Sequence, residues 1–246
     1  MTDFAPGTPV WVDLATPDAT ASLAFYGGLF GWTATDPVQE FGGYQNLLLD
    51  GRHVAGLTPM GGPIWMTHFS TTDADVSAAL VTENGGRIAY EPMDVADLGR
   101  LAICEDPQGA PFGLWQPGRH TGAELVNAPG ALIWNELHSE ELAAATPFYE
   151  AVLGWSAVAE EAGGHPYTVF TVGGRPVAGG SANGGTPHWL VWFGAADADA
   201  TAARAQELGA ELAMGPFDID GVGRTAVLID PQGASFGVLQ SETPDE

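Results

Sequence analysis

The side chains with the clearest chemical potential lie on two short stretches that both open with tryptophan. Residues 11–14 read Trp-Val-Asp-Leu, and residues 134–138 read Trp-Asn-Glu-Leu-His. Because strand residues two apart share a face, Asp13 would lie beside the first tryptophan, and Glu136 and His138 beside the second. An apolar surface disfavours the charged form of a carboxylate, which suits general acid–base catalysis. We therefore predict these three residues as catalytic candidates.

A structural role is the alternative for the same side chains. Buried carboxylates normally need partners, so Asp13 and Glu136 could instead bond neighbouring backbone groups or an arginine of the other half of the chain. His138 is two residues from Glu136, close enough for the two to form a pair. Both interpretations stay open at the level of sequence.

Tryptophan supplies the second signal. Aromatic walls with a few polar groups are typical of binding sites for flat, largely apolar ligands. The residues that we predict to bind such a small molecule lie on expected strands and are Trp11, Trp65, His68, Trp115, Trp134, His188, Trp189 and Trp192. Ordinary core packing is the alternative, and it is the expected role of Trp32 and Trp155.

A metal site is a further alternative. Glu136, His138 and His188 would supply two imidazoles and one carboxylate, a set that binds divalent metals, in the second half of the chain. The leading interpretation involves no metal and no other cofactor. The remaining histidines are expected in exposed turns and are His53, His120 and His165.

An internal repeat sets the architecture. The opening stretch at residue 11 and the following Phe25-Tyr26 recur 123 positions later, at residue 134 and at Phe148-Tyr149. One inserted residue then makes the offset 124, which relates the two Asp-Pro-Gln-Gly turns at residues 106 and 230. Repetition of this kind indicates a duplicated fold.

Each half reads as an α+β domain made of two strand–helix–strands modules. The predicted domains are residues 1–117 and 130–246, joined by a linker at 118–129, and residues 242–246 are expected to form a frayed acidic tail. The elements predicted in the first half are a strand at 10–15, a helix from Asp18 to Gly31, strands at 44–49, 53–58 and 65–70, a helix at 73–83, and strands at 87–92, 100–105 and 112–116.

Charge and composition limit the partners. The formal net charge of −24 opposes nucleic acid and anionic membranes, so we expect neither as a partner. No stretch approaches the roughly 20 apolar residues of a membrane span, and the N-terminus lacks the features of a signal peptide. The single cysteine, Cys104, fits a reducing cytoplasm. The repeat is compatible with a monomer or a loose homodimer.

The sequence resembles the vicinal oxygen chelate superfamily, the glyoxalase/bleomycin-resistance/dioxygenase proteins. The resemblance rests on the helix motifs around Phe25-Tyr26 and Phe148-Tyr149 and on the two Asp-Pro-Gln-Gly turns, in order and twice. It implies tandem domains in which paired βαβββ modules curl into half-barrel cups. It also implies three or four His/Glu ligands around a divalent metal, with activities from isomerisation and ring cleavage to drug sequestration.

The chain departs from that family at the ligand positions. The resemblance assigns the first ligand to Trp11 and Trp134, and the closing ligand to Gly113 and Gly237. The third ligand falls near Trp65 and Trp189. Neither indole nor glycine is a ligand for a divalent cation.

We therefore expect a small-molecule protein of this fold, and an enzyme of isomerase, hydratase or lyase type acting on an aromatic or polyketide-like metabolite without a metal. One alternative is a non-catalytic protein that sequesters such a molecule. The other is a metal-dependent lyase or dioxygenase.

Overall fold

The structure is a computed structural model that describes residues 4–182 and 185–242. Most of the predicted acidic tail, residues 243–246, lies outside the described residues, as do residues 1–3. Each half of the repeat contributes two βαβββ modules, and its strands form one eight-stranded sheet. The orders are β2-β3-β4-β1-β5-β8-β7-β6 and β10-β11-β12-β9-β13-β16-β15-β14. The predicted α+β class and paired modules are confirmed.

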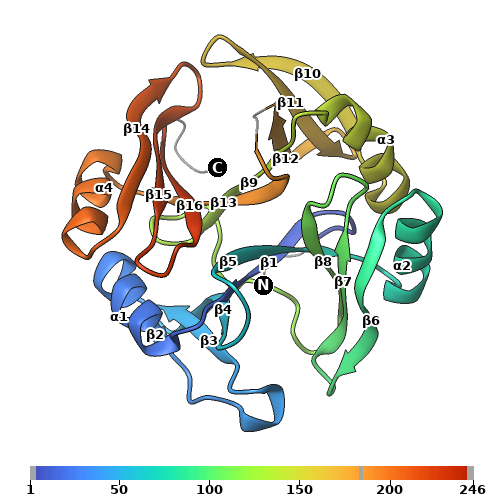
Figure 1. Cartoon of the computed structure of the whole chain (residues 1–246), viewed down its shortest axis with the longest axis horizontal. Coiled ribbons are helices and arrows are strands. Elements are labelled where there is room, and N and C mark those ends of the chain that lie inside the picture. Colours follow the sequence, from blue (N-terminus) through green and yellow to red (C-terminus); the bar gives the residue numbers. More distant parts are fainter. Residues whose placement is uncertain (1–3, 183–184, 243–246) are drawn as a thin grey trace. The chain divides into compact units, whose positions relative to one another are not determined.

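The first half contains β1 to β8 and two helices (Figure 1). Its elements are β1 (Pro9–Ala15), α1 (Ala19–Phe30), β2 (Thr33–Ala34), a short 3-10 helix η1 (Gln39–Phe41), β3 (Gln45–Leu49), β4 (Arg52–Thr58), β5 (Ile64–Ser70), α2 (Ala74–Glu83), β6 (Arg87–Val95), β7 (Gly99–Glu105) and β8 (Pro111–Pro117). Each predicted helix and strand of this half is present within a few residues of its predicted bounds.

The second half repeats the same order. Its elements are β9 (Leu132–His138), α3 (Leu142–Leu153), β10 (Ser156–Ala162), β11 (His165–Val172), β12 (Arg175–Ser181), β13 (His188–Gly194), α4 (Ala198–Glu207), β14 (Glu211–Ile219), β15 (Gly223–Ile229) and β16 (Ser235–Ser241).

The chain divides into two compact units that do not coincide with the two sequence halves. Unit 1 comprises Met1–Trp11, Met66–Gly122 and Asn135–Trp189, and therefore holds the second and third modules. Unit 2 comprises Val12–Trp65, Ala123–Trp134 and Leu190–Glu246, and holds the first and fourth modules. The sequence boundaries 1–117, 118–129 and 130–246 divide the chain by repeat, whereas the compact units divide it by module.

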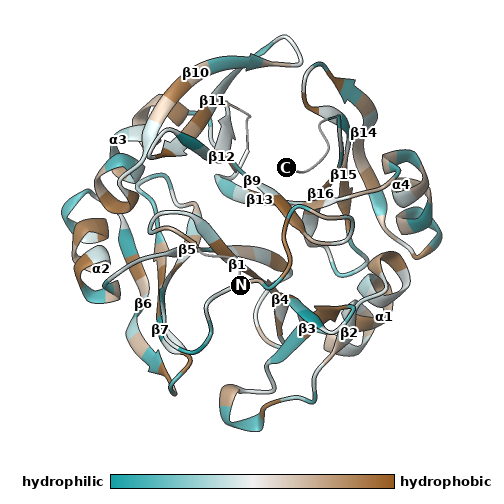
Figure 2. Ribbon diagram, turned by 180° about the vertical axis from the view of Figure 1, so that it is seen from behind, coloured by the Kyte–Doolittle hydropathy of each residue, from teal (hydrophilic) through white to brown (hydrophobic). Residues whose placement is uncertain are grey.

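Three of the four α-helices in the described residues start at an aspartate side chain that caps the first turn, and α3 does not. Asp18 accepts a hydrogen bond from Ala21 N and closes the first turn of α1, while Gly31, at φ 75°, ends the helix in the left-handed conformation. Asp73 and Asp197 cap α2 and α4 in the same way. Asp18 is thus the N-cap residue that precedes the first turn of α1. In Figure 2, hydrophilic and hydrophobic bands alternate along α2 and α4, as expected for helices packed on one side.

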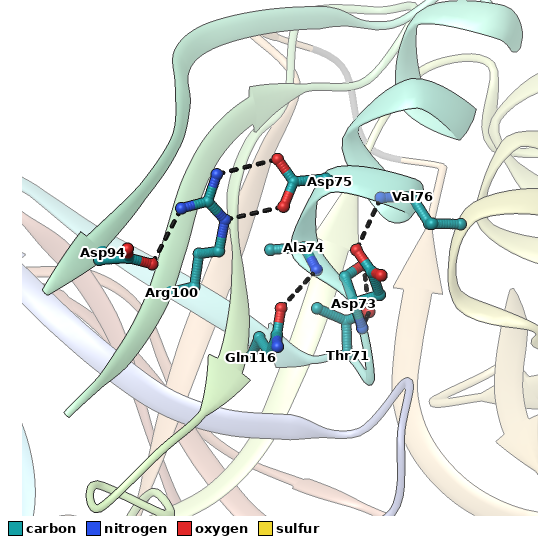
Figure 3. A network of polar contacts seen from close by, with 8 residues as sticks. All are labelled: Thr71, Asp73, Ala74, Asp75, Val76, Asp94, Arg100 and Gln116. Atoms are coloured by element: carbon teal, nitrogen blue, oxygen red, sulfur yellow. Dashed lines mark hydrogen bonds and ion pairs between the residues drawn. The ribbon is translucent and has the colours of Figure 1, made fainter. Parts of the chain in front are cut away.

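An arginine ties the start of α2 to the edge strand β6 (Figure 3). Arg100 forms two hydrogen bonds with Asp75, at 2.8 and 2.9 Å, and one of 2.9 Å with Asp94. These contacts raise the pKa of Arg100 and lower that of Asp75. Arg224 repeats the arrangement with Asp199 and Asp218. Arg100 and Arg224 are therefore equivalent structural residues of the two halves.

A buried hydrogen-bond chain lies at the centre of each unit. In unit 2, Trp65 Nε1 donates to the Tyr26 hydroxyl over 2.9 Å, and this hydroxyl donates to Asp230 Oδ2 over 2.9 Å. The other oxygen of Asp230 accepts backbone N–H groups of its own turn. Burial, followed by the charge of Asp230, raises the pKa of Tyr26 well above its usual range. The helix motif and the turn motif are thus bonded to each other, across the two sequence halves.

Unit 1 contains the equivalent chain. Trp189 Nε1 donates to Tyr149 over 3.0 Å, and Tyr149 donates to Asp106 Oδ2 over 3.0 Å. Trp65 and Trp189 are 2% and 3% exposed, and each belongs to the core beneath a helix. This corrects their expected place in a ligand-binding wall: alternation along β5 and β13 turns them toward the helices. We assign both indoles to the cores.

Among the described residues, no helix is both long enough and apolar enough to cross a membrane.

The two hydrogen-bond chains predict a specific stability loss. Tyr26→Phe removes the donor to Asp230 and the acceptor of Trp65, and should lower the free energy of unfolding by about 1–3 kcal/mol, because buried polar groups lose their partner. Tyr149→Phe should behave alike. Urea unfolding followed by circular dichroism measures the effect. Tyr90→Phe, at a tyrosine that is 63% exposed, is the matched control and should change little. Equal stability of all three variants would contradict the structural role.

Candidate functional site

The sheet faces turned away from the helices carry the polar residues of interest. In the third module Leu137, Phe170 and Ala178 pack in the core with helix α3. Because side chains alternate along a strand, Glu136 and His138 of β9 point to the opposite face. Gly179 of β12 pairs with Glu136, and Ser181 pairs with His138. The predicted catalytic pair therefore lies on one face of the sheet, beside two small residues.

Glu136 is the centre of a compact polar cluster. The Ser181 hydroxyl donates to Glu136 Oε1 over 2.6 Å, and His138 Nε2 lies 3.0 Å from the same oxygen. The side chains of His138 and Glu136 are 14% and 13% exposed. Both of these polar contacts of the carboxylate, from the Ser181 hydroxyl and from His138, are made by Oε1. A carboxylate held in this way can accept a proton in a fixed direction.

His188 extends the cluster. Its ring centroid lies 4.8 Å from that of His138, and its Nδ1 is 2.9 Å from the carbonyl oxygen of Thr186. Since a carbonyl only accepts, Nδ1 carries the proton, and Nε2 of the neutral ring is then an acceptor. Burial is the main cause that lowers the pKa of His188, and the neighbouring His138 lowers it further, against the opposing effects of Thr186 and Glu136. His188 thus favours the neutral form.

Tyr167 adds a hydroxyl that sequence reasoning did not assign to the site. A Cβ at Gly179 would overlap the Tyr167 hydroxyl, so this glycine makes room for the phenol beside the strand that carries Glu136. The signal was available, because Tyr44/Tyr167 and Gly56/Gly179 recur with the repeat. Ser181 gave no comparable signal, since its counterpart in the first half is Thr58.

Asp13 lies in a simpler version of this arrangement, in unit 2. The Tyr44 hydroxyl donates to Asp13 Oδ1 over 2.7 Å, and Gly56 pairs with Asp13 in the sheet. A Cβ at Gly56 would overlap both side chains. The carboxylate, tyrosine and glycine are therefore common to both halves. The counterparts of His138 and His188 are Ala15 and Ile64, so the histidines belong to the second half alone.

The aromatic residues of the first half pack against a ring from the linker. His120 lies between Trp11, at a centroid distance of 4.5 Å, and Trp115, at 5.5 Å. Trp115 Nε1 also donates to the His120 carbonyl over 2.9 Å. His120 was expected in an exposed turn, but its ring is half-buried because both indoles cover it. His165 is exposed, as expected, and His53 lies within β4.

Trp134 and Trp192 come together in unit 2. Trp192, Leu190 and Leu239 form a buried cluster against which Trp134, Ile133 and Val227 pack. Trp192 lies over Gly237 of the neighbouring strand, and His68 lies over Gly113 at the equivalent place in unit 1.

The family's metal site does not fit these residues. A Cβ at Gly113 would overlap the His68 ring, and a Cβ at Gly237 would overlap the Trp192 ring. The space of the closing carboxylate ligand is thus taken by a ring in each half. Among the described residues, no group of three His, Cys, Asp or Glu side chains is arranged to hold a metal ion. Glu136, His138 and His188 therefore do not form such a group.

Comparison with known proteins agrees with the fold. Residues 8–114 match the family model described as Glyoxalase/Bleomycin resistance protein/Dioxygenase superfamily, and residues 136–239 match the model described as Glyoxalase-like domain. The chain is 44% identical over 251 residues to the protein named "Putative glyoxylase CFP32" of Mycobacterium tuberculosis, with 97% of this chain and 96% of that protein covered.

Two further similarities are informative. The chain is 42% identical over 265 residues to "Anthracycline biosynthesis protein DnrV" of Streptomyces peucetius, covering 98% of this chain and 95% of that protein. Among solved structures, the 2,3-dioxygenase LapB from Pseudomonas sp. KL28 superposes with a TM-score of 0.68 at 13% identity, covering 99% and 96% of the two chains. The structural likeness concerns the fold alone.

A substitution at Gly237 tests whether the Trp192 ring fills the position of the family's closing ligand. Gly237→Ala should lower the free energy of unfolding by about 1–3 kcal/mol, because the added methyl group overlaps the Trp192 ring. Gly62→Ala is the control, since a Cβ there meets nothing within 4 Å. Urea unfolding compares the two variants with the wild type. A stable Gly237→Ala variant would show that the ring yields, and that a ligand residue could be accommodated.

Proposed function

The chain belongs to the glyoxalase/bleomycin resistance protein/dioxygenase superfamily, and we propose that it is an enzyme that performs metal-independent acid–base chemistry on an aromatic, polyketide-like metabolite. The observation that supports this proposal is the Glu136 cluster, in which the Ser181 hydroxyl and His138 both contact Oε1 of a carboxylate that is 13% exposed. Isomerisation, hydration and lyase-type elimination all require the removal of a proton that such a carboxylate can accept.

Each member of the cluster has a distinct role in this proposal. Glu136 Oε2 takes a proton from a carbon acid or hydroxyl of the substrate. Ser181 and His138 hold Oε1, which fixes the direction of the carboxylate, and His138 can return a proton to the product. The neutral His188 ring lies next to His138 and presents Nε2 as a hydrogen-bond acceptor. Asp13 and Tyr44 would perform a simpler version of the same acid–base chemistry in unit 2.

The substrate class is supported by two observations. The protein DnrV, which is 42% identical to this chain, carries anthracycline biosynthesis in its name. In unit 2, considered separately from the Glu136 cluster of unit 1, the buried indole of Trp192 and the neighbouring Trp134 and Leu239 provide flat apolar contact area. A polycyclic aromatic ligand matches such a surface. The same surface would equally serve a protein that binds this kind of molecule and leaves it unchanged.

A test compound with an acidic C–H bond can distinguish an enzyme from a protein that only sequesters its ligand. We expect the wild type to accelerate hydrogen–deuterium exchange at the benzylic carbon next to the carbonyl of 2-tetralone, followed by proton NMR in deuterium oxide. Glu136→Gln should reduce the accelerated rate by about 10²–10⁴-fold, the usual contribution of a general base. Its affinity for 2-tetralone, measured by calorimetry, should be almost unchanged, because the amide has the shape of the carboxyl group.

The control for this comparison is Glu150→Gln, at an exposed glutamate of α3, which should keep the wild-type rate. Asp13→Asn reports how much unit 2 contributes. A wild type that binds 2-tetralone without accelerating exchange would support sequestration and refute the catalytic proposal.

Metal dependence is tested by chelation. Dialysis against EDTA should leave the exchange rate unchanged, and elemental analysis should find substoichiometric divalent metal in the protein as purified, because indole and glycine occupy the ligand positions. A stoichiometric metal whose removal abolishes exchange would instead favour a metal centre at Glu136, His138 and His188. Tryptophan fluorescence of the dialysed protein verifies that the fold persists.

A further inference from the structure

The fourth module presents an apolar face on the side away from its helix. Phe193, Leu228 and Phe236 pack with the alanines of α4 in the core of unit 2. Alternation along β13, β15 and β16 therefore turns their neighbours Trp192 and Val227 to the opposite face.

Strand register arranges this face into rows. Trp192 pairs with Gly237, Gly237 with Val227, and Val227 with Met214, so the four residues cross β13, β16, β15 and β14 in line. A second row runs alongside and contains Gly194, Leu239, Thr225 and Phe217. Since Gly237 has no side chain, the Trp192 ring lies directly over its backbone.

Exposure changes along the rows. Trp192 and Leu239 are 8% and 9% exposed, whereas Met214 and Phe217 at the edge strand are 49% and 37% exposed. Large apolar side chains are thus continuous from the buried indole to solvent. A face of this composition is suited to a flat apolar molecule that lies along the row and reaches the indole at its inner end.

The indole of Trp192 is distinguished by its N–H group. Five other tryptophans donate this hydrogen to identified acceptors: Trp32 to Gly130 O, Trp65 to Tyr26, Trp115 to His120 O, Trp155 to Gly7 O and Trp189 to Tyr149. Trp192 Nε1 is buried and has no hydrogen-bond partner within the described part of the chain. An unsatisfied buried donor costs free energy, so its retention points to an acceptor that arrives with a ligand.

We propose that Trp192 Nε1 donates a hydrogen bond to a ketone or quinone oxygen of a flat aromatic ligand, whose rings lie against Val227, Leu239 and Met214. This inference rests on the proposed function for its substrate class, and it adds the group that selects a carbonyl-bearing aromatic over a plain hydrocarbon. The counterpart of Trp192 in the first half is His68, so an imidazole takes the place of the indole there.

A matched ligand pair isolates the hydrogen bond. 9-Fluorenone and fluorene have the same flat tricyclic body, but only fluorenone carries a carbonyl oxygen. The wild-type protein should bind fluorenone about 3- to 10-fold more tightly than fluorene, the range expected for one neutral hydrogen bond. Isothermal titration calorimetry in dilute dimethyl sulfoxide measures both dissociation constants. Equal affinities, or no binding of either compound, would overturn the proposal.

Trp192→Phe removes the N–H group and keeps an aromatic ring. The preference for fluorenone should disappear in this variant, while fluorene affinity should stay within about twofold of the wild-type value. Trp32→Phe is the control, because the Trp32 N–H is satisfied by the Gly130 carbonyl; the preference should persist. A Trp192→Phe variant that still prefers fluorenone would assign the hydrogen bond to another donor.

Indole NMR gives a readout that does not depend on the variant folding. In wild-type protein labelled with ¹⁵N-tryptophan, fluorenone should shift the Trp192 Hε1 resonance downfield and slow its exchange with water, whereas fluorene should do neither. An unchanged resonance would contradict the proposal. Because these experiments measure binding alone, they can fail while Glu136 remains catalytic, and they can succeed in a protein that only sequesters its ligand.

Discussion

Two buried hydrogen-bond chains fix the positions of two helices against two turns, and the rest of the fold is built around these contacts. Each joins an indole N–H, a tyrosine hydroxyl and an aspartate at a turn, and the six residues are Trp65, Tyr26 and Asp230, and Trp189, Tyr149 and Asp106. In each chain the tyrosine comes from a helix of one half and the aspartate from a turn of the other. The carboxylate also accepts its own turn's backbone N–H groups, so helix position and turn conformation are coupled. This coupling explains why the compact units combine modules of different halves.

These chains and the apolar cores occupy the helix sides of the sheets, and the polar side chains of the candidate site lie on the opposite faces. There the halves share a carboxylate, a tyrosine and a glycine, and then diverge. Asp13 has a tyrosine partner, whereas Glu136 has gained a serine and a histidine, with His188 close to that histidine. The two halves thus share the scaffold, and the second half contains the larger polar cluster.

The poor fit of these residues to the family's metal site has a steric as well as a chemical basis. His68 and Trp192 lie over Gly113 and Gly237, where a closing ligand would need its Cβ. Glycine at these positions therefore does not record a simple loss of a ligand. It accommodates a ring, and in the second half that ring brings a buried donor to an apolar face.

The sequence by itself determined the duplicated α+β fold, because repeated motifs and alternating strands are local signals that recur in both halves. It also placed Glu136 beside His138, since residues two apart on a strand must share a face. Ser181 and the core position of Trp189 were decided by the tertiary structure alone. The first depends on the register between β9 and β12, and the second on which face of β13 meets helix α3. The register between two strands, and the sheet face that packs against a helix, are set by packing between distant segments. No local pattern of residues encodes them.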